Sequence, residues 1–205
     1  MALKVTTFSS KGRATRIYSY KTKKINHLQS DNQLRTFLIL EWNDSVKDIK
    51  ENVELIDLEA TIYNVENLRL DKFSDKEANL YKLHTNFLLT IVRNKEEEQV
   101  AVSVKSLSEL QRKTVIEKME IERRYWKAKG VSFYVVTEKE IDKQFVENIK
   151  WAREAFIDKS IENKEELKEG TALFILRYLI AVKEVEINMK EKLDLNDSIN
   201  KRINF

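Results

Sequence analysis

The chain has 205 residues, of which 42% are hydrophobic and 35% charged, and its formal net charge is +3. This length suits one large domain, or one domain with a small additional region. The sequence has no cysteine and only three, isolated glycines, which excludes disulfides, thiolate metal sites and glycine-rich phosphate loops. It also lacks a signal-peptide pattern and any apolar run of about 20 residues, so we expect a cytoplasmic protein with no membrane partner.

The positive charge is concentrated at the start of the chain, where residues 1–30 include seven basic side chains and no acidic one. Strand-like runs at Thr15–Tyr20 and Lys24–Leu28 predict a small β-hairpin. Tyrosines and a histidine lie between the basic residues, a mixture that suits contact with nucleic acid. The alternative is a basic surface that only meets solvent. The residues that we expect to bind DNA are Lys11, Arg13, Arg16, Lys21, Lys23 and Lys24.

A helix is predicted over Asp31–Trp42, because Ser30 offers an N-cap and the apolar residues recur at helical spacing. Gln33 lies at the edge of that apolar stripe, in the first turn, where a glutamine is ordinarily a surface residue. Weaker patterns follow: a possible strand near Val53–Ile56 and a helix over Asp57–Leu70.

A buried β-hairpin is the next strong signal. Apolar runs at Phe87–Val92 and Val100–Val104 flank a charged turn at Asn94–Glu98. Because side chains alternate along a strand, the valines of the second run point to one face, and Ser103 and Lys105 point to the other together with Ala101. We therefore expect a lysine and a serine side by side at the end of this strand.

Ser106–Lys129 gives the longest helix signal, and Glu122 lies inside its apolar stripe. A glutamate in that position is either part of a functional site or paired at the margin of the stripe with Lys118. A strand at Val131–Thr137 and a helix at Glu138–Phe156 follow. This order of elements predicts an α/β fold with a mixed sheet flanked by helices.

The chain is expected to divide into three regions: an N-terminal arm and hairpin at residues 1–30, a core at residues 31–157, and a short helical C-terminal interaction region at residues 158–205. The helical pattern of the last region runs over Glu165–Lys192. It is too short to be expected to fold as an independent domain.

Six segments of the chain, in this order, resemble the TnsA family, which provides the endonuclease subunit of heteromeric transposases. The resemblance covers about the first three quarters of the chain, and its most specific part is IERRYW followed by a strand and TEKEI. The matching segments are Arg16–Asp31 (RIYSYKTKKINHLQSD), Phe37–Asn52 (FLILEWNDSVKDIKEN), Leu83–Leu89 (LHTNFLL), Val100–Leu110 (VAVSVKSLSEL), Ile116–Ile141 (IEKMEIERRYWKAKGVSFYVVTEKEI) and Glu147–Trp151 (ENIKW).

The resemblance implies a restriction-endonuclease-like core of the PD-(D/E)xK type, which cuts the 5′ ends of the transposon with the help of Mg²⁺. It also implies double-stranded DNA, a DDE-type transposase subunit and an AAA+ ATPase regulator as partners. The implied catalytic positions are Gln33, Asn86, Ser103, Lys105 and Glu122. The implied metal ligands are Gln33, Asn86, Glu122 and the backbone carbonyl of Val104.

At two of these positions the chain departs from the family pattern. Gln33 stands where the family has a glutamate, and Asn86 stands where it has an aspartate. Because Mg²⁺ needs the charge of carboxylates, we expect binding of Mg²⁺, or of Mn²⁺ in its place, and cleavage to be severely reduced.

Two origins of the amides fit this pattern: a natural pseudo-nuclease that serves as a DNA-binding scaffold, or the deliberate inactivation of an active nuclease. A third reading is a DNA-binding regulator without nuclease ancestry. That reading leaves the Ser103 and Lys105 pattern unexplained.

Overall fold

The structure, a computed structural model, describes residues 14–62, 66–77, 79–156 and 172–193. Contacts divide the chain into two compact units, Met1–Glu140 and Ile141–Phe205, which are described separately below. The division into an arm, a core and a C-terminal region at residues 30 and 157 stays a prediction.

The first unit carries both sheets. Its elements, in chain order, are β1 (Thr15–Tyr18), β2 (Ile25–Leu28), α1 (Asp31–Trp42), β3 (Val46–Glu54), α2 (Leu58–Thr61), the 3₁₀ turn η1 (Leu70–Phe73), β4 (His84–Arg93), β5 (Glu96–Val104), α3 (Leu107–Leu110), α4 (Lys113–Ala128) and β6 (Ser132–Val136). The second unit contains α5 (Lys143–Arg153), the 3₁₀ turn η2 (Glu154–Phe156) and α6 (Ala172–Ala181).

The main sheet has the strand order β3-β4-β5-β6. The first two neighbouring pairs are antiparallel, and β5 pairs with β6 in parallel after the chain has passed through α3 and α4. Asn94 and Lys95 link β4 to β5 and both have positive φ angles, 53° and 70°, as the two central residues of a tight hairpin turn require. The sheet is therefore mixed, as predicted.

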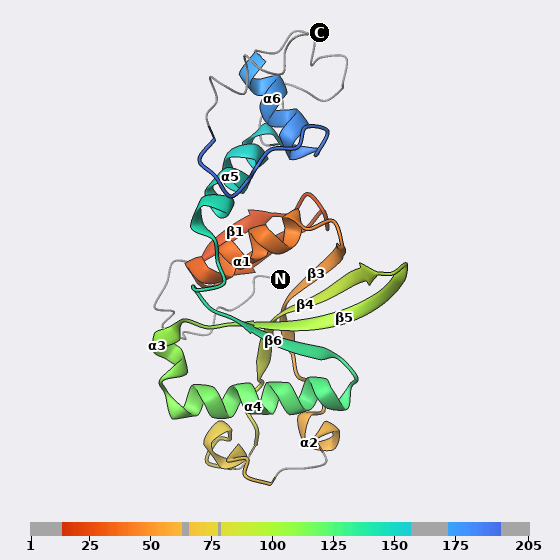
Figure 1. The fold of residues 1–205 in the computed structure, drawn as a ribbon. Coiled ribbons are helices and arrows are strands. Elements are labelled where there is room, and N and C mark those ends of the chain that lie inside the picture. Colours follow the sequence, from red (N-terminus) through yellow and green to blue (C-terminus); the bar gives the residue numbers. More distant parts are fainter. Residues whose placement is uncertain (1–13, 63–65, 78, 157–171, 194–205) are drawn as a thin grey trace. The chain divides into compact units, whose positions relative to one another are not determined.

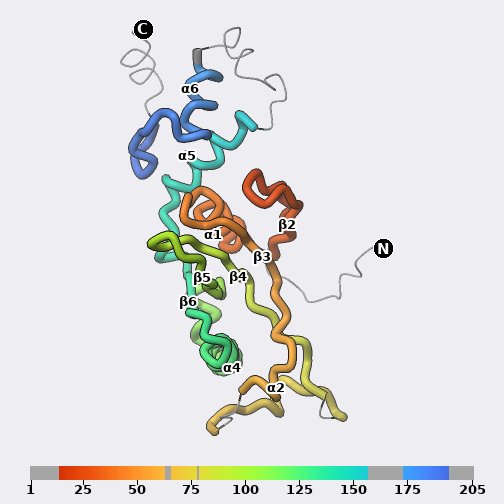
Figure 2. The backbone as a smooth tube through the Cα atoms, turned by 90° about the vertical axis from the view of Figure 1, so that its right-hand side faces the viewer, coloured from red at the N-terminus to blue at the C-terminus, as the bar shows by residue number. Residues whose placement is uncertain are grey.

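Helices cover both faces of this sheet, with α1 on one side and α4 on the other (Figures 1 and 2). On the α1 side, Phe37 packs against Phe87 and Val102 in a buried apolar cluster. On the α4 side, Ile121 and Trp126 pack in a second cluster that includes Leu88 and Ala101. The expected alternation along β5 is thus confirmed, since Val102 and Ala101 face opposite helices.

The small hairpin of β1 and β2 forms a separate two-stranded sheet beside α1, as predicted. The helix predicted over Asp31–Trp42 is also confirmed: it starts at the Ser30 N-cap, whose hydroxyl accepts a hydrogen bond from the N–H of Gln33. A well-matched cap and a continuous apolar stripe are both local signals, which explains why the sequence located this helix accurately.

Four other predictions were wrong in extent. The helix predicted over Glu138–Phe156 is α-helical over Lys143–Arg153, because Asp142 caps it there, and it ends in a 3₁₀ turn. The strand near Val53–Ile56 runs instead over Val46–Glu54, because Val46 and Ile49 are both buried in the cluster on the α1 side; a register irregularity between Val46 and Asp48 breaks the simple alternation that marks a strand in sequence. The helix predicted over Asp57–Leu70 is α-helical over Leu58–Thr61 among the described residues of that range, from which residues 63–65 are missing. The helix predicted over Ser106–Lys129 is two helices, since the backbone of Arg112 is extended, with φ −88° and ψ 121°.

In the second unit, Asp142 caps α5 by accepting a hydrogen bond of 3.0 Å from the N–H of Phe145. The guanidinium of Arg177 in α6 lies over the ring of Trp151 and is paired with Glu154. The helix predicted over Glu165–Lys192 is observed over Ala172–Ala181, and residues 165–171 lie outside the described residues. No helix in the described part of the chain is both long and apolar enough to cross a membrane.

Candidate functional site

The candidate site lies where β4 and β5 part. Their recorded pairing ends at Phe87 and Val102. Beyond that pair, the backbone N–H of Val104 donates to the side-chain oxygen of Asn86 at 2.7 Å. The Ser103 hydroxyl and the Lys105 ammonium approach the same Asn86 oxygen at 3.4 and 3.5 Å. One amide oxygen therefore faces three donors, all from the last residues of β5 and the residue that follows it.

A second chain of polar contacts joins β4 to α4. Trp126 donates its indole N–H to the Thr85 hydroxyl at 2.8 Å, and this hydroxyl donates to Glu122 Oε2 at 2.9 Å. Glu122 and Thr85 are both fully buried, at 0% exposure. The other carboxylate oxygen of Glu122 accepts no hydrogen bond from the described residues and lies 3.9 Å from Lys118 Nζ. The sequence-based pairing of Glu122 with Lys118 is thus present, but Glu122 is buried rather than marginal.

These two sets of contacts form one electrostatic cluster. Burial raises the pKa of Glu122, while Lys118, Lys105 and the hydroxyls of Thr85 and Ser103 oppose that rise. Burial also lowers the pKa of Lys105, and Glu122 opposes that fall. Each group thus acts on the charge of the other, and we call Asn86, Ser103, Lys105, Lys118 and Glu122 the Lys105 cluster.

Gln33 is engaged elsewhere. Its side-chain oxygen accepts a hydrogen bond of 2.9 Å from the N–H of Gln29, which lies just before α1, the helix whose first turn contains Gln33. Within the described residues, no recorded hydrogen bond or ion pair joins Gln33 to the Lys105 cluster. Of the five predicted catalytic positions, four are therefore gathered by direct contacts or mutual electrostatic effects, and Gln33 is not.

Glu138 is a polar residue near the site that the sequence analysis did not select. Both of its carboxylate oxygens accept from the N–H of Leu107 at 3.1 Å, and one lies 3.5 Å from the side-chain amide nitrogen of Asn32. Glu138 thereby ties the segment after Lys105 to the first turn of α1. Its position could have been anticipated, because Glu138 is the second residue after β6, Lys105 is the first after β5, and parallel strands end at the same edge of a sheet.

The predicted DNA-binding side chains of the small hairpin differ in their surroundings. Arg16, Lys23 and Lys24 are exposed, whereas Lys21 is half-buried and its ammonium donates to the carbonyl of Asn43. Lys11 and Arg13 lie outside the described residues. The rings of Tyr18 and Tyr20 meet edge to face, with centroids 5.5 Å apart, and Tyr18 is 45% exposed. An exposed aromatic ring thus accompanies the exposed cations.

The donor set does not fit a magnesium ion. The Lys105 cluster contains one carboxylate against two ammonium groups, and the Asn86 oxygen already accepts the Val104 N–H. No group of three or more histidine, aspartate or glutamate side chains that could hold a metal occurs among the described residues. Because Mg²⁺ sheds water reluctantly and needs anionic oxygen ligands, this arrangement favours an anion over a divalent cation.

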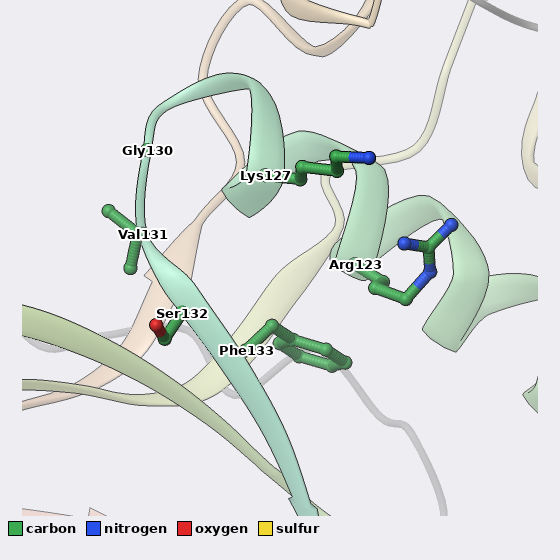
Figure 3. A pocket seen from close by; sticks show the side chains of 6 residues that line it. All are labelled: Arg123, Lys127, Gly130, Val131, Ser132 and Phe133. Atoms are coloured by element: carbon green, nitrogen blue, oxygen red, sulfur yellow. The ribbon is translucent and has the colours of Figure 1, made fainter.

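A separate open pocket of about 430 Å³ lies where α4 ends and β6 begins. Figure 3 shows the side chains of Arg123 and Lys127 on the helix and of Phe133 on the strand lining it. None of the predicted catalytic residues lines this pocket.

Comparison with known proteins shows which family this chain resembles in sequence. Residues 43–138 match the family described as TnsA-like endonuclease N terminal. That range includes Asn86, Ser103, Lys105 and Glu122, and it excludes Gln33. The transposition protein TnsA of transposon Tn7 from Escherichia coli is 36% identical over 150 residues, which are 73% of this chain and 54% of that protein. The chain thus spans about half the length of this curated relative.

The match also fixes the fold class. A four-stranded mixed sheet with helices on both faces, within a segment that matches a TnsA-like endonuclease domain, is a restriction-endonuclease-like core. The fold predicted from the sequence is therefore confirmed.

Proposed function

Since the chain belongs to the TnsA-like endonuclease family, we propose that it is the DNA endonuclease subunit of a cut-and-paste transposase and that its own nuclease site is catalytically impaired. The substrate is the DNA at the transposon ends, where the ancestral reaction hydrolyses a phosphodiester at the 5′ end. The impairment lies in the amides of Gln33 and Asn86.

The contact between Asn86 and the end of β5 carries this proposal. Asn86 sits among Ser103, Val104 and Lys105 as a member of the catalytic set would, and its oxygen holds the Val104 N–H at 2.7 Å. An aspartate here could keep that hydrogen bond with one oxygen and offer the second to a cation. Asn86 offers an NH₂ group in its place, and the hydrogens of that group repel a cation.

The remaining residues retain part of the chemistry. Lys105 supplies a positive charge beside the strand end, where it can stabilise charge that develops on a phosphate. Glu122 is a buried carboxylate whose position is fixed by Thr85. TnsA-like endonucleases generally use divalent metals, and Mg²⁺ or Mn²⁺ would need further carboxylates here to be held.

A non-catalytic role is the second candidate, favoured by the donor set that does not fit a metal. In that role the chain is a pseudo-nuclease that binds DNA and links the partner DDE-type transposase to the AAA+ ATPase regulator. The exposed cations of the β1–β2 hairpin support DNA binding under either candidate.

Restoring the carboxylates separates the two candidates. The double variant Gln33→Glu with Asn86→Asp is tested for nicking of transposon-end DNA in Mg²⁺, with the partner transposase present. The impaired-nuclease proposal expects cleavage by this variant, none by the parent chain, and loss of cleavage when Lys105→Ala is added. A restored variant that never cuts, even in Mn²⁺, would overturn it in favour of the scaffold.

The basic arm has its own test. Neutralising Lys11, Arg13 and Arg16 to glutamine is expected to weaken binding to duplex DNA and to lower the salt dependence of the affinity by about one unit of slope for each lost phosphate contact. Lys47→Gln with Lys50→Gln, exposed on β3, is the control. An unchanged affinity and salt slope would contradict DNA binding by the arm.

A further inference from the structure

The balance of charge in the Lys105 cluster is positive. Its two ammonium groups, Lys105 and Lys118, face a single carboxylate, Glu122. The other charged groups that act on Lys105 are Glu109 and Arg112, and these two pair with each other at 3.3 Å. Their charges largely cancel at the site, so the excess positive charge belongs to the two lysines.

We infer that the Lys105 cluster binds a phosphodiester group of DNA directly, without a divalent cation, through Lys105, Lys118 and the side-chain NH₂ of Asn86. The inference rests on the proposed function, because it takes DNA to be the molecule that reaches this site. It also goes beyond that function, because it gives the impaired site a ligand of its own.

The geometry of Asn86 supports an anion here. Its oxygen accepts from the donors at the end of β5, so its NH₂ group is the part of the side chain that can donate to an incoming ligand. A phosphate oxygen accepts hydrogen bonds from NH₂ and ammonium groups, and such charge-assisted contacts are the stronger kind. Lys118, with 30% of its side chain exposed, lies at the solvent side of the cluster, where a DNA backbone can meet it.

The same argument explains what a carboxylate at position 86 would change. It would bring two negative groups against two positive ones and so remove the excess charge that attracts phosphate. The added negative charge would also repel the phosphate directly, and the expected loss of affinity is about tenfold. A bound divalent cation would reverse this loss by neutralising the added carboxylate.

The test measures the affinity of the full chain for a fluorescently labelled DNA duplex, in EDTA and in Ca²⁺. The parent chain is expected to bind equally in both. Asn86→Asp is expected to bind about tenfold more weakly in EDTA and to recover in Ca²⁺. Asn94→Asp, which adds the same charge in the β4–β5 turn, is the matched control and is expected to behave like the parent.

A second pair of variants tests the lysines. Lys105→Gln is expected to weaken binding in EDTA about tenfold and to lower the salt slope by about one, whereas Lys127→Gln, exposed on α4, has a smaller effect. Thermal unfolding of each variant shows whether it is folded. If Lys105→Gln does not fold, the binding of Asn86→Asp tests the inference by itself. That variant is expected to fold, because an aspartate can still accept the hydrogen bond from the Val104 N–H.

Two results would overturn the inference: parent binding that requires Ca²⁺, or Asn86→Asp binding in EDTA no more weakly than Asn94→Asp. Its failure is distinct from that of the proposed function, which is decided by nicking. If the restored double variant cleaves DNA but Asn86→Asp does not bind more weakly in EDTA than in Ca²⁺, only the phosphate site is contradicted. If Asn86→Asp shows that difference but the double variant does not cleave, only the nuclease proposal is contradicted.

Discussion

Two glutamates two positions apart on α4 have opposite environments. Glu120 lies at the surface and accepts hydrogen bonds from Arg123 and Arg124, and the bond from Arg123 is the main reason that its pKa falls to about 2. Glu122 is fully buried, and its burial raises the pKa of its carboxyl. One side of the helix thus carries exposed ion pairs, and the other carries a buried polar network.

The difference shows which contacts of α4 determine the site. Exposed ion pairs are screened by water and hold flexible side chains, so each contributes little to stability. A buried carboxylate must have partners, because leaving it unpaired costs several kcal/mol. Thr85 and Trp126 are therefore structural requirements for placing Glu122 beside Lys105, whereas the ion pairs of Glu120 with its arginines contribute little.

The largest expected effect comes from breaking the buried network. Thr85→Val keeps the shape of the side chain but removes the donor to Glu122 and the acceptor for Trp126. We expect the free energy of unfolding, measured by urea denaturation, to fall by about 2–4 kcal/mol. Thr90→Val, half-buried on the same strand, is the control. An equal loss in both variants would show that the network is not what stabilises this region.

An intermediate effect is expected at the edge of the site. Glu138→Ala removes the acceptor for the N–H of Leu107 and frees α3 from α1. The free energy of unfolding should fall by about 1–2 kcal/mol, and hydrogen exchange of the Leu107 amide should accelerate. Glu138→Gln keeps one acceptor oxygen and should lose less. If glutamine is as damaging as alanine, the charge of Glu138 matters more than its hydrogen bond.

The smallest effect is expected on the exposed side of α4. Since the folded-state pKa of Glu120 is about 2, below its ordinary 4.5, its ion pairs stabilise the fold above pH 4.5 and lose this effect as the pH falls toward 2. Glu120→Gln should therefore lower stability near neutral pH by about 0.5 kcal/mol or less, because the pair is exposed to water. Thermal unfolding from neutral to acidic pH measures this difference, which should shrink as the pH falls. A difference that grows in acid would contradict the assignment.

Local patterns in the sequence determined much of the framework. The cap at Ser30 and the apolar stripe behind it located α1 to the residue, and alternation along β5 separated Ala101 from Val102. Spacing of four residues paired Lys118 with Glu122. These features depend on residues close in the chain, whose geometry is fixed by helical or strand periodicity.

Where no such signal exists, the sequence was misleading. The helix expected over Ser106–Lys129 is interrupted at Arg112, although no glycine or proline marks the break. The short extent of α2 likewise contradicts an apolar spacing that looked helical. In both places tertiary packing outweighed weak local propensity.

The sequence by itself therefore determined α1, the β4–β5 hairpin, the family resemblance and the two amides that set this chain apart from the family pattern. Only the tertiary structure decided what those residues touch. It brought Thr85 to Glu122 across 37 positions of the chain, turned the Asn86 oxygen toward Val104, and left Gln33 bonded to Gln29. The physical reason is that such contacts join distant segments, which periodicity cannot specify and which only the packing of α4 and the parting of β4 from β5 bring into reach.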